Sequence, residues 1–352
     1  MLGRLKMDVD ECINAYNKLS SQAFTRKALF PIDKHCNIKE RFDSKQLELA
    51  LKSAVMDRGY DQDTLLKDPD TSCRVVLCAT QGETGRTVAL RSYTNDRNSS
   101  ELYNTASIWE AGRATSAAST FFDPITIGPN RQTFLDGATG SNNPIRHLWV
   151  EAQDVWSSRP LEDQIGCIVS IGTGVPKAVK PRTNKIGGLK YVKENVLDTE
   201  QDENEFAHEH PSFVANNQYF RFNVPDDLAK IGLEKVGKID EIVDITQHHL
   251  AKDTVLVQVQ TCAGSLCKAK GILKVSPWEV TGLIRSQSRL DQSKCIQLKS
   301  SILYLMLMVF EDNASNQGST SCASYESGPA EKNSRTGKFL GLFGSKKPSV
   351  AV

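Results

Sequence analysis

The sequence CRVVLCAT, at residues 73–80, is the feature that most limits how this chain can fold. Its apolar side chains are nearly continuous, whereas a strand with one face in water alternates apolar and polar residues. A strand of this kind has both faces covered, as in a parallel sheet that lies between layers of helices. The run therefore predicts an α/β domain.

Segments with helical periodicity are expected to supply the covering layers. Residues 7–19 place apolar side chains on one face, and Asp8 followed by Glu11 is the pattern of a capping box. Residues 45–57 repeat the periodicity and stop before Gly59, a residue suited to ending a helix. Further helices are expected at residues 101–118, which are rich in small side chains, and at 240–250 and 254–267.

Other short apolar segments are predicted to form the remaining strands. They are residues 87–93, 133–136, 166–174 and 219–224, the last an edge strand because its apolar and polar residues alternate. Strands that alternate with helices favour a three-layer α/β domain with helices on both faces of its sheet, expected over residues 1–267. Residues 268–352 are expected to be an irregular, largely disordered tail, because 311–336 are rich in Ser, Asn, Gly and Glu.

Composition excludes several classes of protein. The 352 residues carry a formal net charge of +1, which gives no overall attraction to nucleic acid. Nine cysteines without a CxxC pair indicate reduced thiols, not a disulfide framework or a zinc site. The longest apolar run, residues 302–310, is about half of the roughly 20 residues that span a bilayer. We therefore expect a soluble protein of the cytoplasm that can contact membranes peripherally.

The stretch TFLDGATGSNNPI, residues 133–145, raises a functional alternative. Asp-Gly is a common turn pair, so Asp136 can be an ordinary turn residue. Asp136 also stands at the C-terminal end of a predicted strand, the edge at which α/β sheets place their sites. The loop that follows contains Asn142 and Asn143, whose amide groups can hold a carboxylate in position. The residues alone leave both interpretations open.

Three segments in a fixed order carry a family resemblance. IWEAGRATSAASTFFDP, TFLDGATGSNNPI and CIVSIGTG, within residues 108–174, together resemble the second half of a patatin-like phospholipase domain. MDVDECINAYNKLS is similar to the fungal-type members, and the resemblance covers roughly residues 1–267. It implies a lipid acyl hydrolase that uses a Ser–Asp dyad, with the serine in a G-x-S-x-G turn.

On this resemblance, Asp136 is the general base that a weakly nucleophilic serine hydroxyl needs. Gly137 and Ala138 complete its D-G-A motif, and Asn142 and Asn143 support the motif. However, no serine in the chain has glycine both two residues before it and two residues after it, and no Gly-rich oxyanion loop is present. We therefore expect a patatin-like α/β sheet that is truncated at its N-terminus and lacks its first strands and its nucleophile. The alternative is a pseudoenzyme or fragment with a binding or regulatory role.

The resemblance also implies partners. The substrates would be lipid or phospholipid acyl esters, met transiently at a membrane surface, and no nucleic acid is expected. No cofactor or metal is expected, and calcium should not be needed, because a Ser–Asp dyad requires no metal. The sequence leaves the oligomeric state open.

Two other motifs have plain structural explanations. SIGTG, at residues 170–174, is expected to be a turn at a strand end and not a phosphate cradle, because no G-K-[ST] follows. His248 and His249 have no second cluster at metal-ligand spacing, so we expect them at a solvated helix end.

Overall fold

The structure is a computed structural model of the chain. It describes residues 1–27, 40–68, 73–95, 101–119, 121–139, 141–176, 199–226, 228, 231–269, 305–310 and 349–351. The segment 311–336 lies outside these residues, so its predicted disorder and the division near residue 267 stay predictions, although residues 305–310 and 349–351 of the expected tail form strands.

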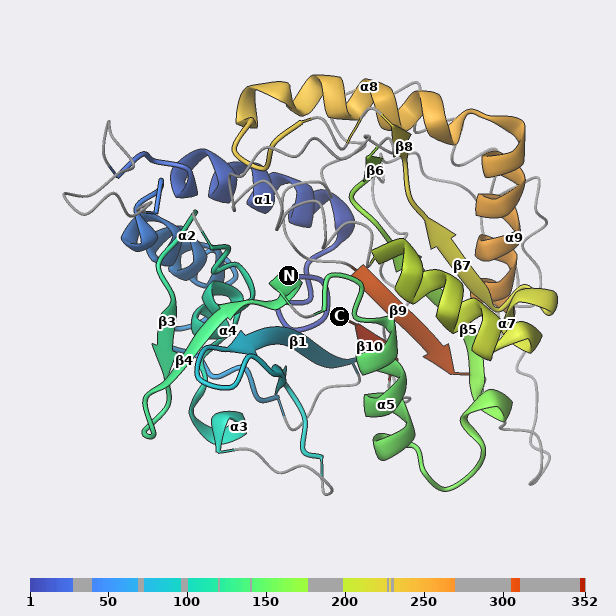
Figure 1. Cartoon of the computed structure of the whole chain (residues 1–352), viewed down its shortest axis with the longest axis horizontal. Helices are drawn as coiled ribbons and strands as arrows, with labels where there is room; N and C mark the ends of the chain where they lie inside the picture. Colours follow the sequence, from blue (N-terminus) through green and yellow to red (C-terminus); the bar gives the residue numbers. More distant parts are fainter. Residues whose placement is uncertain are drawn as a thin grey trace, which may run out of the picture.

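A mixed sheet forms the centre of the protein (Figure 1). Within the described residues it has eight strands in the order β3-β4-β1-β10-β9-β5-β7, and β2 pairs with β1 off this path. The strands are β1 (Cys73–Gln81), β2 (Thr87–Arg91), β3 (Ile125–Ile127), β4 (Gln132–Asp136), β5 (Ile165–Ile171), β7 (Tyr219–Phe222), β9 (Leu305–Phe310) and β10 (Ser349–Ala351). A separate pair joins β6 (Val175–Pro176) to β8 (Pro225–Asp226).

The directions of the strands differ from one neighbour to the next. β1 runs antiparallel to β2 and β4 and parallel to β10, and β5 runs parallel to β7 and antiparallel to β9. The apolar run of β1 is therefore not the mark of a purely parallel sheet. Cover on both faces is enough to account for it, since both faces then exclude polar side chains.

The helices predicted at residues 7–19, 45–57, 240–250 and 254–267 are confirmed, whereas the helices at residues 145–155, 199–209 and 211–215 were not predicted. The helices are α1 (Val9–Ala23), α2 (Ser44–Met56), α3 (Leu102–Thr105), α4 (Ile108–Thr115), α5 (Ile145–Val155), α7 (Pro211–Ala215), α8 (Ile239–Leu250) and α9 (Asp253–Ala269), and residues 199–209 are also helical. The capping box at the start of α1 is confirmed, because the Glu11 N–H donates to Asp8 and the Asp8 N–H donates to Glu11.

The single helix expected at residues 101–118 is wrong. The segment forms α3 and α4, separated by Ala106 and Ser107. Ser107 has extended backbone angles, and its hydroxyl oxygen accepts a hydrogen bond from the N–H of Glu110. The Ser107 N–H in turn donates to the Glu110 carboxylate. This second capping box ends the first helix and starts the next, since an N-cap residue leaves the helical region of φ and ψ.

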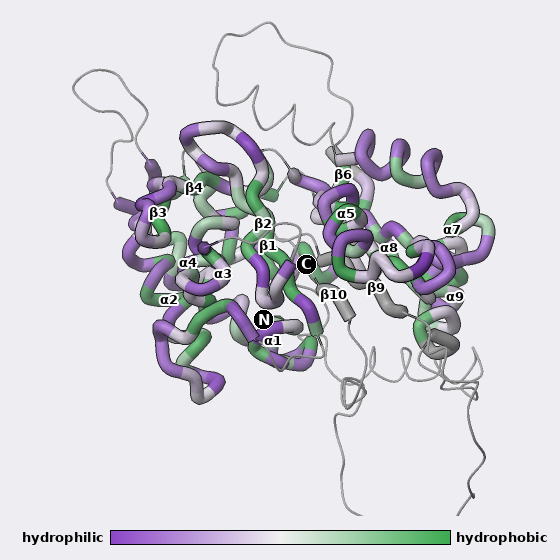
Figure 2. The backbone as a smooth tube through the Cα atoms, turned by 90° about the horizontal axis from the view of Figure 1, so that it is seen from below, coloured by the Kyte–Doolittle hydropathy of each residue, from purple (hydrophilic) through white to green (hydrophobic). Residues whose placement is uncertain are grey.

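β5 shows how the layers cover the sheet. Ile168 on one face packs with residues of α5, among them Leu148 and Trp149. Cys167 and Val169 on the other face pack in a cluster with Cys262 of α9. Figure 2 shows hydrophobic residues at β1 and β2 and many hydrophilic residues along the outer helices. The three-layer α/β arrangement is thus built around buried strands.

The far edge of the sheet is β7, as the alternation of residues 219–224 predicts. Its main chain is partly satisfied from α9, because the Gln258 side chain donates to the carbonyl oxygen of Arg221 at 3.1 Å. Such a bond reduces the number of free acceptors that an edge strand offers to another chain. In the part of the chain that the structure describes, no helix combines the length and the apolarity needed to cross a membrane.

β9 and β10 join the two parts of the sheet. β9 pairs with β5 from Ile165 to Ile171 on one side and with β10 on the other, and β10 continues the sheet to the start of β1. Met308 of β9 stands opposite both Ile168 and Val350. Backbone pairing at this strand therefore links the half of the sheet that contains β4 with the half that contains β7.

Met308→Pro should lower the melting temperature of the protein. Proline has no N–H for the ladder and is not accommodated in a central strand. Loss of one hydrogen bond costs about 1 kcal/mol, which is roughly 2–4 °C for a domain of this size, and distortion of the ladder adds to it. Thermal unfolding followed by circular dichroism measures the change, with Met308→Val as the control that keeps the N–H. Equal melting temperatures for Met308→Pro and the unaltered chain would contradict the bridging role of β9.

Candidate active site

Asp136 is the last residue of β4 and lies inside the protein. It stands opposite Ala79 in the antiparallel pairing of β4 with β1, and it is 4% exposed. A 3₁₀ turn over Gly137–Thr139 follows at once, so the chain leaves the sheet directly after the aspartate. The predicted strand end is confirmed, and it places a carboxyl group within the core.

The main chain of Asp136 is held from two sides. Its N–H donates to the carbonyl oxygen of Ala117 at 3.1 Å, in the connection that follows α4. Its own carbonyl oxygen accepts from the hydroxyl of Thr80 on β1 at 2.9 Å. Two segments that are distant in sequence therefore fix the backbone from which the carboxyl group projects.

The carboxyl group itself has an unusual electrostatic environment. The N–H of Ala138 donates to its Oδ1 at 2.8 Å. Burial nevertheless raises the pKa of Asp136 to about 8, because removal from water disfavours the charged form more than one hydrogen bond stabilises it. A carboxyl group whose pKa lies near neutrality can accept and release a proton at physiological pH, which is the requirement for a general base.

Gly137 allows the turn to pack against the sheet. A Cβ atom built at this position would lie 2.2 Å from the carbonyl oxygen of Cys78 and 3.4 Å from the hydroxyl of Thr115. The first distance is far inside the range of real carbon–oxygen contacts, and the obstacle is backbone that cannot rotate away. Glycine is therefore required here by the close approach of the turn to β1.

The loop after the turn connects the site to another helix. Asn142 donates to the hydroxyl of Thr199 at 2.8 Å, and Asn143 donates to the Thr199 carbonyl oxygen at 3.1 Å. Asn143 is 2% exposed, and among the described residues its Oδ1 atom has no hydrogen-bond partner. These amide groups tie the loop to the start of the helix at residues 199–209, and their support of the Asp136 motif stays a prediction.

The glycine-rich turn after β5 is closed by protein side chains. A Cβ atom at Gly172 would lie 2.5 Å from the Asn223 side chain, and the N–H of Gly174 donates to Asn223 Oδ1 at 2.7 Å. The N–H group that a phosphate cradle would use is thus already bonded. The arrangement favours the structural turn that the sequence predicts over a phosphate site.

The paired histidines of the sequence lie at the end of a helix. His248 and His249 are in the last turn of α8. Among the described residues, no group of three or more His, Cys, Asp or Glu side chains is arranged to hold a metal ion. His208 lies in the helix at residues 199–209, and the centroid of the His210 ring lies 4.2 Å from that of Trp149.

Sequence reasoning did not identify the residues that hold Asp136 in place. Thr80 and Ala117 act from two other segments. Their contributions are a hydroxyl group or a main-chain carbonyl, which nearly every segment of a protein offers. Only an indirect signal was available, since Ala117 lies within the small-residue stretch RATSAAS that is part of the family resemblance.

Gly137→Ala should destabilise the protein strongly. The added methyl group collides with the Cys78 carbonyl, and overpacking of this kind costs about 1–3 kcal/mol or more. The matched control is Gly237→Ala, because a Cβ at Gly237 would meet nothing within 4 Å. Urea unfolding of both variants measures the free energy of unfolding. Equal values for the two variants would contradict the close packing of the turn on β1.

Asp136→Asn should stabilise the protein at pH 8 and have little effect at pH 4. The pKa of Asp136 is raised in the folded chain from 3.8 to about 8, so the folded state holds a proton that the unfolded state releases. The stability of the unaltered protein therefore falls as pH rises through this window, by up to about 1.4 kcal/mol per pH unit from this group. Asparagine keeps the acceptor oxygen and does not ionise.

The measurement is the melting temperature of Asp136→Asn and of the unaltered chain at half-unit steps of pH. Asp163→Asn is the control, because Asp163 is exposed in the turn before β5. The difference should grow with pH for Asp136→Asn alone. Parallel curves for Asp136→Asn and the unaltered protein would show that Asp136 has an ordinary pKa.

The chain is similar in sequence to known proteins that are named as phospholipases. Residues 4–149 match the family model "Patatin-like phospholipase". The chain is 30% identical over 230 residues to "Calcium-independent phospholipase A2-gamma" of Homo sapiens and 27% identical over 226 residues to that of Mus musculus, in each case over 63% of this chain and 28% of the relative.

A plant protein gives a shorter match. The chain is 34% identical to "Phospholipase A I" of Arabidopsis thaliana over 134 residues, which are 36% of this chain and 9% of that protein. The chain thus covers little more than a quarter of the length of its mammalian relatives and less of the plant one. The matched region includes Asp136, its turn and the strands that hold them, and the chain carries a patatin-like phospholipase domain at residues 4–149.

Proposed function

We propose that this domain is the base-carrying part of a lipid acyl hydrolase, in which Asp136 serves as the general base of a Ser–Asp dyad. The observation that carries the proposal is the buried carboxyl group at the end of β4, whose pKa is raised to about 8. The family of the domain supports hydrolysis of lipid acyl esters in general. The buried acid supports the particular role of Asp136.

The chemistry needs a second group that this chain does not contain. A serine hydroxyl attacks the ester carbonyl only when a base removes its proton, and the ester then breaks through an acyl-serine intermediate that water hydrolyses. None of the serines in the chain lies in a G-x-S-x-G sequence. We therefore propose that the serine and the N–H groups that stabilise the oxyanion come from polypeptide outside these 352 residues.

The proposed substrates are acyl esters of phospholipids at a membrane surface. The mammalian relatives are named as calcium-independent phospholipases A2, and the plant relative as a phospholipase A. A dyad of serine and aspartate works by proton transfer between two side chains, so the proposed reaction needs no calcium ion. The proposed location is the cytoplasm, with transient contact at membranes.

A second candidate is a domain that binds lipid or a partner without catalysis. The lack of a G-x-S-x-G serine favours it, together with a sheet that is continuous from β3 to β7 through β10 and β9. Both candidates predict that the 352-residue chain fails to hydrolyse short acyl esters and is not labelled by a fluorophosphonate. The two differ in what the domain does once a nucleophile is supplied.

The deciding experiment joins to Met1 the segment that precedes the matched region in the mouse relative. The extended chain should release fatty acid from phosphatidylcholine vesicles in the presence of a calcium chelator, and a fluorophosphonate should abolish this activity. Asp136→Asn in the same chain should lower kcat by about 10²-fold or more, because it removes the base. The exposed substitution Asp163→Asn should leave the rate unchanged.

Two outcomes would decide against parts of the proposal. Near-normal turnover in the Asp136→Asn chain would show that another group accepts the serine proton. A folded extended chain that binds the vesicles but neither hydrolyses them nor reacts with the fluorophosphonate would favour the binding domain.

A further inference from the structure

The position of Asp136 depends on the connection between α4 and β3, of which the structure describes residues 116–119 and 121–123. α4 ends at Thr115, and the chain then turns through Ala117, whose carbonyl oxygen accepts the Asp136 N–H at 3.1 Å. Phe121 and Phe122 later in the connection donate back to the Ala118 carbonyl at 2.9 and 3.0 Å. This connection, residues 116–123, needs anchors at both ends if the Ala117 carbonyl is to stay in place.

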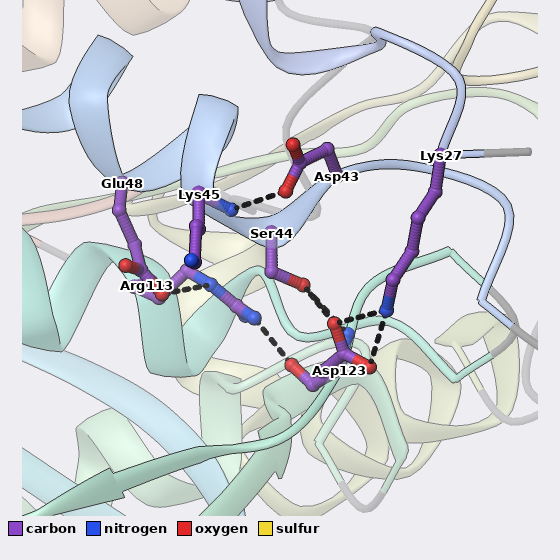
Figure 3. A network of polar contacts seen from close by, with 7 residues as sticks. All are labelled: Lys27, Asp43, Ser44, Lys45, Glu48, Arg113 and Asp123. Carbon is purple, nitrogen blue, oxygen red and sulfur yellow. Dashed lines mark hydrogen bonds and ion pairs between the residues drawn. The ribbon is translucent and has the colours of Figure 1, made fainter.

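Its far end is fixed by Asp123 (Figure 3). The Ser44 hydroxyl, at the first residue of α2, donates to the Asp123 carboxylate at 2.7 Å, and the Asp123 N–H donates back to Ser44 at 2.9 Å. Lys27 adds an ion pair at 3.0 Å on the exposed side. These contacts hold Asp123 against α2.

Arg113 ties the same residue to the last turn of α4. Its Nη2 donates to the main-chain carbonyl oxygen of Asp123, so the guanidinium spans the connection from its beginning to its end. Arg113 is 1% exposed, and the Phe122 ring lies 5.7 Å from the guanidinium carbon. The hydrogen bond from Arg113 to Asp123 therefore closes a loop of the backbone that contains Ala117.

A role in packing alone does not account for this arginine. Its Nε and Nη1 atoms have no hydrogen-bond partner among the described residues, and the Glu48 carboxylate that faces Nε is 3.6 Å away. Burial lowers the pKa of Arg113, although Glu48 and Asp123 act in the opposite direction. A buried cation with unused donors is costly, and an apolar side chain of similar volume is often as stable or more so. The directional bond to Asp123 is what an apolar residue would lose.

We propose that Arg113 is a positioning residue for Asp136. By holding the Asp123 carbonyl it fixes residues 116–123, so that the Ala117 carbonyl remains in place to accept the Asp136 N–H. Arg113 does not touch the carboxyl group and acts through the backbone between them. The proposal rests on the proposed function only in that Asp136 is taken to be the general base. The link from Arg113 through the connection to the Asp136 N–H is a property of the 352-residue chain itself.

The first test measures amide hydrogen exchange in the 352-residue protein. Arg113→Met keeps the length of the side chain and removes its donors, and Arg113→Lys keeps one donor. The exchange of the Asp136 amide should accelerate at least tenfold in Arg113→Met relative to the Leu148 amide, which bonds to Pro144 at the start of α5. Arg113→Lys should recover part of the protection. The ratio of the two exchange rates corrects for any change in global stability, because global unfolding exposes both amides.

The second readout is the titration of the Asp136 carboxyl carbon by ¹³C NMR. A loosened connection admits water, so the midpoint should fall by at least one pH unit in Arg113→Met and by less in Arg113→Lys. Arg146→Met is the matched control, because Arg146 is an exposed arginine that pairs with Glu205 and Glu209. It should change neither the exchange ratio nor the titration.

An exchange ratio within twofold of the unaltered protein, with an unchanged titration of Asp136, would overturn the proposal. If Arg113→Met fails to fold, the exchange ratio and the Asp136 titration are judged by the same criteria in Arg113→Lys and in Ser44→Ala. The Ser44→Ala substitution releases Asp123 from α2. In the extended enzyme, Arg113→Lys should lower kcat and leave KM unchanged. Normal kcat for Asp136→Asn in the extended enzyme would refute the role of Asp136 as the base. It would leave the hydrogen-exchange result for Arg113 unaffected, so the two proposals can fail independently.

Discussion

The antiparallel contact between β1 and β4 determines most of what the candidate site can do. It sets Asp136 opposite Ala79 and brings the following turn so close to Cys78 that only glycine fits there. Because the carboxyl group then lies in the core, water does not stabilise its charge. The same contact that holds the strand in the sheet thus produces the raised pKa of Asp136.

A second buried carboxyl group shows how specific this environment is. Glu151 on α5 receives hydrogen bonds from Arg91 Nε at 2.6 Å and from the Tyr93 hydroxyl at 2.9 Å. Its charge is matched by a cation, and the pair fastens α5 to β2. Asp136 accepts one backbone hydrogen bond, which lowers its pKa, and among the described residues no cation offsets the effect of its burial. The fold therefore uses one buried acid as an anchor and leaves the other able to exchange its proton.

Much of the fold was predictable because its signals are local. The capping box of α1, the strand at residues 73–80 and the strand end at Asp136 depend on neighbouring residues, and all three are confirmed. The break between α3 and α4 was not predicted, although Ser107 and Glu110 carry a local signal for it. Small residues on both sides of the break continued the helical pattern and obscured that signal.

The sequence by itself determined the class of fold, the family and the position of the acid, since each depends on residue types in a fixed order along the chain. Only the tertiary structure decided the mixed direction of the strands, the burial of Asp136 and the links that hold it to Thr80 and Ala117. It also brought Arg113 and Ser44 together at Asp123. The physical reason is that burial and hydrogen bonding between distant segments depend on the path of the whole chain, and common hydroxyl and carbonyl groups give no sign in the sequence of which partner they will meet.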